Sequence, residues 1–266
     1  DRRRGGRVTF DRARPVAVIG GAGFIGQHVC RELRRRGLIP WVLDTFVHGE
    51  LSKDAARVAG AICDVDARSA YEIRAILAVQ AVEITLNLAT VSVRACLRDP
   101  FRGAADLAAI GAAVPLACAR VGVRRYVYVS SSEVYGEATD GPLHESDTAR
   151  PGTVYGAGKL AGEHFADAAR ISGALPEVVI VRPFNAYGPR CHVTGEDAVE
   201  AIPRWMVQAA RGEPLTINGD GQQTRDFTYV EDLACGIVDA ALSDACVNAG
   251  PVNLCSGVER SVDSIA

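Results

Sequence analysis

Residues 15–26 read Pro-Val-Ala-Val-Ile-Gly-Gly-Ala-Gly-Phe-Ile-Gly, an apolar run that passes directly into four closely spaced glycines. The β-branched residues of this run predict a buried strand over 15–19. Ile25, Val29 and Leu33 then recur at helical spacing over 24–36, up to the stop at Gly37. A strand that turns through glycines into a helix is the first half of a βαβ unit, so this stretch predicts an α/β fold.

The spacing of these glycines is typical of a dinucleotide site. Gly20 permits the tight turn, Gly23 lets the backbone approach a pyrophosphate, and Gly26 lets helix and strand pack closely. Phe24 and Ile25 begin the helix, whose N-terminal N–H groups are free to bind phosphate. The sequence therefore predicts that Gly20, Gly23, Phe24, Ile25 and Gly26 bind a dinucleotide.

Two carboxylates end the next predicted strands. Asp44 ends the strand over 41–44, at the distance expected for the carboxylate that binds the adenosine ribose. Such a carboxylate would repel the 2′-phosphate of NADP, so NAD is the predicted cofactor. Asp64 follows the strand over 61–63 and is placed to reach the adenine edge; a solvated strand-end carboxylate is the alternative.

The alternation of strands and helices continues along the chain. Further strands are predicted over 84–88, 125–130 and 178–181, with helices over 104–120 and 155–171, the first of them kinked or broken at Pro115. Apolar strands that alternate with helices indicate a parallel sheet covered on both faces. The predicted fold is therefore a Rossmann-type doubly wound sheet over 15–183.

The pattern changes after Pro183. Loops lead to a helix over 199–211, a short strand over 215–217 and another helix from Val230. This change predicts a smaller C-terminal substrate-binding lobe over 184–266.

The bulk composition fits a soluble globular protein. The chain has 266 residues, is 48% hydrophobic and carries a net charge of −3, which favours neither a nucleic acid nor a membrane as partner. Arginines crowd residues 1–14, which we interpret as a flexible basic tail, with docking to an acidic partner as the alternative. The eight cysteines lack the spacing of a metal site, so no metal is expected. No signal peptide or long apolar run is evident, which predicts a cytoplasmic protein.

Four ordered motifs carry a resemblance to a known family. They are the glycines of 20–26, Tyr-Gly-Ala-Gly-Lys at 155–159, Arg-Pro-Phe-Asn-Ala-Tyr-Gly-Pro-Arg at 182–190, and Arg-Asp-Phe-Thr-Tyr-Val at 225–230. Together they resemble the NAD-dependent epimerase/dehydratase family, which are extended short-chain dehydrogenase/reductases that modify nucleotide sugars. The resemblance implies bound NAD, a nucleotide-diphosphate sugar as substrate, and a homodimer through the helices near 104–120 and 155–171. Relatives continue further, so the 184–266 lobe is expected to be truncated at its C-terminus.

The resemblance assigns a catalytic set. Tyr155 and Lys159 lie four residues apart on a predicted helix and share one face. A free tyrosine has a pKa near 10, and we expect the Lys159 ammonium and the nicotinamide ring to lower the pKa of Tyr155 so that it acts as general base. Lys159 also holds the nicotinamide ribose, and Ser131 binds the reacting hydroxyl. Leu88, Ala89 and Thr90 are expected near the nicotinamide.

Ser131-Ser132-Glu133 is the stretch that bears on the reaction. Dehydratases of the family commonly carry Thr-Asp-Glu here, so Glu133 is placed to act as base at C5, whereas the acid expected at position 132 is missing. GDP-mannose dehydratases and UDP-glucuronate decarboxylases carry Thr-Ser-Glu, and simple 4-epimerases often have no carboxylate here. A structural carboxylate at the strand end is the alternative for Glu133.

Substrate contacts are assigned by the same resemblance. Asn185 and Arg225 correspond to ligands of the substrate diphosphate, Arg190 adds a third, and Ser132 lines the sugar site. Solvent-facing salt bridges are the alternative for both arginines. The family's asparagine in the helix after the fourth strand has no clear counterpart here, Asp106 being nearest.

The predicted reaction begins with oxidation at the sugar C4, Tyr155 taking the hydroxyl proton. Loss of water then gives a 4-keto-6-deoxy sugar, rotation of the keto sugar gives a 4-epimer, and loss of CO₂ from a uronic acid gives a pentose. Glu133 favours a 4,6-dehydratase, with a UDP-sugar 4-epimerase and a UDP-glucuronate decarboxylase as alternatives. A non-catalytic NAD-binding sensor or scaffold is the rival from another class.

Overall fold

The computed structural model describes residues 10–47, 51–79, 81–137, 141–191 and 201–266. A seven-stranded, wholly parallel sheet forms its centre, in the strand order β3-β2-β1-β4-β5-β6-β9. Its strands are β1 (Pro15–Ile19), β2 (Ile39–Asp44), β3 (Ala61–Asp64), β4 (Ile84–Asn87), β5 (Arg125–Val129), β6 (Glu177–Pro183) and β9 (Pro251–Leu254). The order reverses between β1 and β4, as in a Rossmann fold, so the predicted doubly wound sheet is confirmed.

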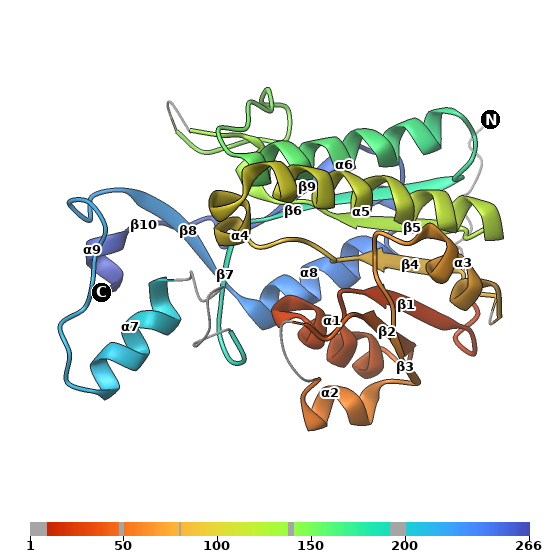
Figure 1. Cartoon of the computed structure of the whole chain (residues 1–266), viewed down its shortest axis with the longest axis horizontal. Helices are drawn as coiled ribbons and strands as arrows, with labels where there is room; N and C mark the ends of the chain where they lie inside the picture. Colours follow the sequence, from red (N-terminus) through yellow and green to blue (C-terminus); the bar gives the residue numbers. More distant parts are fainter. Residues whose placement is uncertain (1–9, 48–50, 80, 138–140, 192–200) are drawn as a thin grey trace.

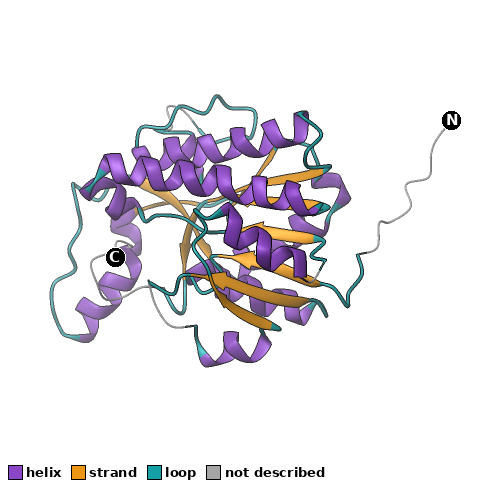
Figure 2. Ribbon diagram, turned by 45° about the vertical axis from the view of Figure 1, so that its right-hand side comes forward, coloured by secondary structure: helices purple, strands orange, loops and turns teal. Residues whose placement is uncertain are grey.

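Helices cover both faces of this sheet (Figures 1 and 2). One face carries α1 (Phe24–Arg35) and α8 (Val230–Leu242), and the other carries α3 (Ala70–Val79), α5 (Pro100–Val121) and α6 (Val154–Ile171). Alternate strand residues serve the two cores: Val16 and Val18 pack with Leu33 of α1, whereas Ala17 and Ile19 pack with Val114 of α5. The remaining helices are α2 (Lys53–Val58), α4 (Val93–Arg98), α7 (Ala201–Ala210), α9 (Val262–Ile265), η1 (Ser132–Val134) and η2 (Asp244–Cys246).

A second sheet of three short strands stands beyond the first (Figure 1). Its order is β10-β8-β7, with β7 spanning Asn185–Tyr187, β8 Thr224–Tyr229 and β10 Glu259–Ser261. Residues after 184 do not all belong to this small sheet and its surroundings. Helix α8 returns to pack against α1, and β9 pairs with β6 as the last strand of the large sheet, so part of the predicted 184–266 lobe belongs to the Rossmann layers.

Helix α5 differs from its prediction. It runs without a break through Pro115, which is buried. Of the predicted kink or break, the break is therefore wrong, and the kink stays a prediction. Packing against α6 holds the helix across the missing N–H group: Gly111 lies so close to α6 that an added Cβ would approach Gly162 Cα to 3.0 Å. At a mean hydropathy of 1.5, α5 is long and apolar enough to cross a membrane by length and composition alone, but here it covers the sheet beside α3 and α6.

Two further predictions need correction. The strand predicted over 215–217 is a loop, because side chains of α7 bind the backbone of Thr216: Gln208 accepts from its N–H at 3.1 Å and Trp205 donates to its carbonyl at 2.9 Å. Residues 1–9 of the predicted basic tail lie outside the described residues. The rest of that tail is docked, since the Phe10 ring lies under the Arg125 guanidinium, at 4.6 Å.

Candidate active site

The glycine turn between β1 and α1 is shaped by backbone contacts. Gly20 has a φ of +78°, and a Cβ there would lie 2.6 Å from Ala89 N, in the turn after β4. A Cβ on Gly26 would lie 2.2 Å from Gly20 O. At Gly23 the nearest described atom to an added Cβ is Gly20 O, at 3.3 Å. Neighbouring backbone therefore leaves no room for a side chain at Gly20 or Gly26, whereas Gly23 has space beside it.

The N-terminus of α1 fits a phosphate. Gly23 occupies the cap position without a side-chain cap, and the first turn holds no acidic residue. Phe24 and Ile25 therefore begin a helix whose first N–H groups lack intrahelical partners and whose dipole favours an anion. This open, uncapped helix end is what the pyrophosphate of a dinucleotide requires.

Asp44 ends β2 beside this turn, as predicted. Its carboxylate accepts from Ala22 N–H at 2.9 Å and from Phe46 N–H at 3.0 Å. A carboxylate has about four lone-pair positions, so these bonds orient Asp44 and leave capacity for ribose hydroxyls. Asp64 lies directly opposite Asp44 in the neighbouring strand β3 and is exposed. The ribose and adenine contacts of these two residues stay predictions.

The turn after β4 is fixed by a buried polar residue at the end of that strand. Asn87 is buried, donates to the Tyr126 hydroxyl at 3.0 Å and accepts from Ala89 N–H at 3.2 Å. These bonds hold Leu88, Ala89 and Thr90 at the carboxyl edge of the sheet, against Gly20. Asn87 thus positions the segment expected near the nicotinamide.

The predicted catalytic residues come together at the carboxyl end of β5. Hydrogen bonds link Tyr155, near the start of α6, with Thr90 and Ser131. Ser131 caps η1 by accepting from Glu133 N–H at 3.2 Å. Gly156 allows η1 to approach α6, because a Cβ there would lie 2.4 Å from Glu133 O. Ser131, Ser132, Glu133 and Tyr155 therefore form one cluster.

The electrostatics of Tyr155 differ from the prediction. Loss of solvent raises its pKa to about 12, and the charge of Glu133 adds to this, while the hydrogen bonds with Thr90 and Ser131 oppose it. Lys159 does not bring the pKa of Tyr155 below its ordinary value as expected. It is buried, donates to Val129 O at 2.7 Å and lies 5.1 Å from the centre of the Tyr128 ring. Burial lowers the pKa of Lys159 to about 8.

A buried polar network missed by the sequence analysis holds α6 in place. Glu163, one turn beyond Lys159 on the same helix face, binds Arg182 of β6 through two bonds of 2.9 and 2.7 Å. The Arg182 guanidinium lies 4.7 Å from the centre of the Tyr135 ring, and the Tyr135 hydroxyl donates to Asn253 of β9 at 2.7 Å. The four-residue spacing of Tyr155, Lys159 and Glu163 was the signal that could have revealed it.

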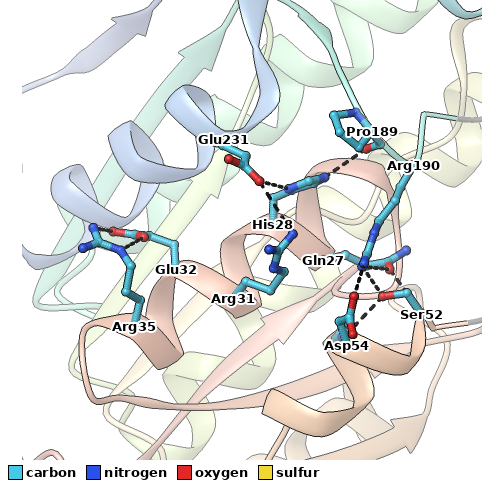
Figure 3. A network of polar contacts seen from close by, with 11 residues as sticks. Gln27, His28, Arg31, Glu32, Arg35, Ser52, Asp54, Pro189, Arg190 and Glu231 are labelled. Carbon is cyan, nitrogen blue, oxygen red and sulfur yellow. Dashed lines mark hydrogen bonds and ion pairs between the residues drawn. The ribbon is translucent and has the colours of Figure 1, made fainter.

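Arg190 lies beside Gln27 of α1 and the first turn of α2 (Figure 3). Its guanidinium binds Asp54 at 2.7 Å, Gln27 at 3.4 Å and the Ser52 hydroxyl. Next to it, Pro189 O lies 3.0 Å from His28 Nε2 on α1. This is the salt-bridge alternative for Arg190, so a contact to the substrate diphosphate would require it to leave Asp54.

Asn185 and Arg225 lie in the three-stranded sheet. Asn185 donates to Asp226 O at 3.2 Å, which ties β7 to β8. Arg225 is exposed, and its one hydrogen bond among the described residues goes to Thr224 O, at 2.7 Å. The roles of both residues as diphosphate ligands stay predictions.

A glycine-lined helix N-terminus beside a Ser, Tyr and Lys cluster defines an NAD-dependent enzyme that oxidises a hydroxyl group. The chain matches the model of the NAD dependent epimerase/dehydratase family over residues 16–255, and it belongs to that family. NAD is its cofactor, and nucleotide sugars are its class of substrate.

Three comparisons describe the family's range. The chain is 32% identical over 260 residues to UDP-N-acetyl-alpha-D-glucosaminuronate decarboxylase of Bacillus cytotoxicus, covering 94% of this chain and 77% of the relative. It is 30% identical over 265 residues to UDP-glucuronic acid decarboxylase 2 of Arabidopsis thaliana, covering 94% and 56%. The solved UDP-glucose 4-epimerase of Thermus thermophilus in complex with NAD superposes with a TM-score of 0.82 at 27% identity, covering 94% and 80%.

Proposed function

We propose that the protein is a lyase that removes CO₂ from a UDP-activated uronic acid, after transient oxidation at C4. The observation that carries this proposal is the make-up of the cluster around Tyr155. Glu133 is a carboxylate beside Tyr155 whose charge raises the pKa of the phenol, and Ser132 stands where an acid would be needed to protonate a leaving hydroxyl. Carbon dioxide leaves without a proton, so its loss needs no acid at position 132.

The chain's own residues serve each stage of this reaction. When bound, NAD supplies the hydride acceptor and a positive ring whose charge favours ionisation of Tyr155. Tyr155 takes the proton of the C4 hydroxyl, which Ser131 holds by a hydrogen bond. The substrate carboxylate is then β to the C4 carbonyl, so the electrons of the breaking bond pass to the C4 oxygen as CO₂ departs. The hydroxyl groups of Tyr155 and Ser131 stabilise that oxygen by donating to it. A proton would then enter at C5, and return of the hydride to C4, with the proton of Tyr155 going back to the C4 oxygen, would complete the pentose.

The curated relatives support the same choice, whereas the solved structure described above is a UDP-glucose 4-epimerase. Both curated relatives described above are named as decarboxylases of UDP-activated uronic acids. From the sequence, Glu133 favours a 4,6-dehydratase, and this reaction is the second candidate. In that reaction Glu133 would remove the C5 proton, and Glu133→Gln should then lower the rate by roughly 10²- to 10⁴-fold.

Product analysis tests the proposal. The purified protein is incubated with NAD and, in turn, UDP-glucuronate, UDP-N-acetylglucosaminuronate, UDP-glucose and dTDP-glucose, and the products are identified by mass spectrometry and NMR. We expect loss of CO₂ from a uronate. Loss of water from a hexose would support the dehydratase, and an unchanged mass with inverted C4 would support an epimerase. No turnover with NAD bound would favour a sensor or scaffold.

We propose in addition that two copies associate through α5 and α6, which lie side by side on the outside of the molecule (Figure 1). Large apolar side chains are exposed there: Phe101 by 90%, Leu116 by 51% and Phe165 by 39%. Covering such a surface by a second copy would remove it from water. Comparing the sedimentation coefficients of the wild type and Phe101→Asp tests this: association through this surface should be weaker in the variant. The cytoplasmic location stays a prediction.

A further inference from the structure

Two arginines face each other across the edge of the three-stranded sheet. In the antiparallel pair of β8 and β10, Arg225 lies directly opposite Arg260. Both residues are exposed, and no ion pair is present for either among the described residues. Side chains directly opposite in a sheet share one face with Cβ atoms about 5 Å apart, and like charges in this position are destabilising. The pair therefore gathers two positive charges on one face of the sheet.

The acidic residues of these strands do not neutralise the pair, because they lie on the opposite face. Glu259 and Asp226 are the next cross-strand pair, and side chains alternate along a strand. Glu259 accepts from the Thr224 hydroxyl at 2.5 Å. Asp226 accepts from Gly257 N–H at 2.7 Å and from Ser256 N–H at 2.9 Å, so its carboxylate holds the turn that leads into β10.

The same face carries a residue already assigned to the substrate. Asn185 pairs with Phe227, two residues after Arg225 on β8, so Asn185, Arg225 and Arg260 share a face by register. Strand β7 begins at Asn185, directly after β6 ends at Pro183. This face therefore begins at the carboxyl edge of the large sheet, the edge at which Ser131 and the glycine turn lie.

We propose that Arg260 binds the diphosphate of the substrate together with Arg225, the two guanidinium groups enclosing one dianion. Each fork donates two hydrogen bonds to phosphate oxygens, and the bound anion removes the repulsion between the arginines. This inference rests on the proposed function, in which the substrate is a nucleotide-diphosphate sugar. It adds a residue of β10 to the assigned set, and it accounts for two like charges at directly opposed positions.

Calorimetric titration with UDP and with uridine tests the pair. Arg260→Gln should weaken UDP binding about tenfold, which is the effect of one charge-assisted hydrogen bond, and should leave uridine binding unchanged. Arg260→Lys should fall between, because it keeps the charge without the fork. Arg225→Gln is the positive control. Arg120→Gln, an exposed arginine at the end of α5, is the matched control and should bind UDP as the wild type does.

Stability separates this role from a structural one. Since Arg260→Gln removes a like-charge contact, its melting temperature should equal or exceed that of the wild type. UDP binding by Arg260→Gln within twofold of the wild type, while Arg225→Gln loses affinity, would overturn the inference and leave the proposed function intact. A wild-type protein that turns over no nucleotide sugar and binds neither UDP, dTDP nor GDP would overturn the proposed function itself.

Discussion

The two sheets of this protein present their functional groups in different ways. In the large sheet the cofactor side is built from backbone: Gly20 and Gly26 leave no room for a Cβ, and the helix end offers N–H groups. In the small sheet the ligand side is built from the ends of exposed side chains, Arg225 and Arg260, on short strands. A backbone site depends on packing around it, whereas an exposed side chain can change without disturbing the fold. Mutations at the glycine turn of the large sheet should therefore lower both stability and NAD binding. Mutations of the exposed arginines of the small sheet should change ligand binding and leave stability unchanged.

The largest difference in stability between variants of the two sheets should come from replacing one strand arginine in each. Arg182 of β6 is buried in its ion pair with Glu163. Arg182→Met leaves Glu163 buried without its partner and should lower the unfolding free energy by about 3–5 kcal/mol. Arg225→Gln, at an exposed position, should change it by less than about 0.5 kcal/mol. Urea denaturation measures the unfolding free energy of both variants. Equal losses would contradict the proposed difference between the two sheets.

Lys159 gives the large sheet a pH dependence that the small sheet lacks. Burial lowers the pKa of Lys159 from 10.5 to about 8, so between these values the unfolded chain binds more protons than the folded protein. The contribution of Lys159 to the unfolding free energy therefore rises with pH across this window. Relative to Lys159→Met, the wild type should gain about 3 kcal/mol over this range.

Denaturation of both proteins at intervals across that window provides the measurement. Lys53, the other lysine of the chain, is exposed at the start of α2 and supplies the control. Lys53→Met should track the wild type at every pH. A flat difference between the wild type and Lys159→Met would show that Lys159 is not buried as a titrating group.

A smaller effect on stability is expected at the glycine turn, with binding lost alongside it. A Cβ at Gly26 would lie 2.2 Å from Gly20 O, so Gly26→Ala should cost about 1–3 kcal/mol and weaken NAD binding in the same variant. Gly152 has no described atom within 4 Å of an added Cβ, and Gly152→Ala is the control. Denaturation and NAD titration are run on both. Normal NAD binding by Gly26→Ala would separate binding from packing in the large sheet.

The sequence predicted the large sheet well because its signals are local. The run of 15–26 contains a strand, a turn and a helix within one window, and each glycine has a steric reason that the structure bears out at Gly20 and Gly26. The wrong predictions concern segments whose secondary structure is determined by contacts with residues distant in the sequence. Strand β9 was missed because four residues pair with a strand some 70 positions earlier in the chain. The loop at Thr216 was misjudged because side chains of α7 take its backbone bonds.

The candidate site shows the same division. The grouping of Ser131, Glu133 and Tyr155 followed from motifs, and the structure brings these residues together. The pKa of Tyr155 did not follow, because it depends first on how deeply the phenol is buried, and then on the hydroxyls of Thr90 and Ser131 and the charge of Glu133. Arg260 carries no motif, and its meaning arises only when β10 pairs with β8.

The proposed reaction depends on Tyr155 as the group that exchanges a proton with the substrate. Release of CO₂ from UDP-glucuronate and from UDP-N-acetylglucosaminuronate should be measured for the wild type, Tyr155→Phe and Tyr71→Phe, the last being an exposed tyrosine on α3. Tyr155→Phe should lose roughly 10²- to 10⁴-fold in rate while it keeps its affinity for NAD and the wild-type melting temperature, and Tyr71→Phe should be unaffected. Turnover by Tyr155→Phe at the wild-type rate would contradict the proposed reaction.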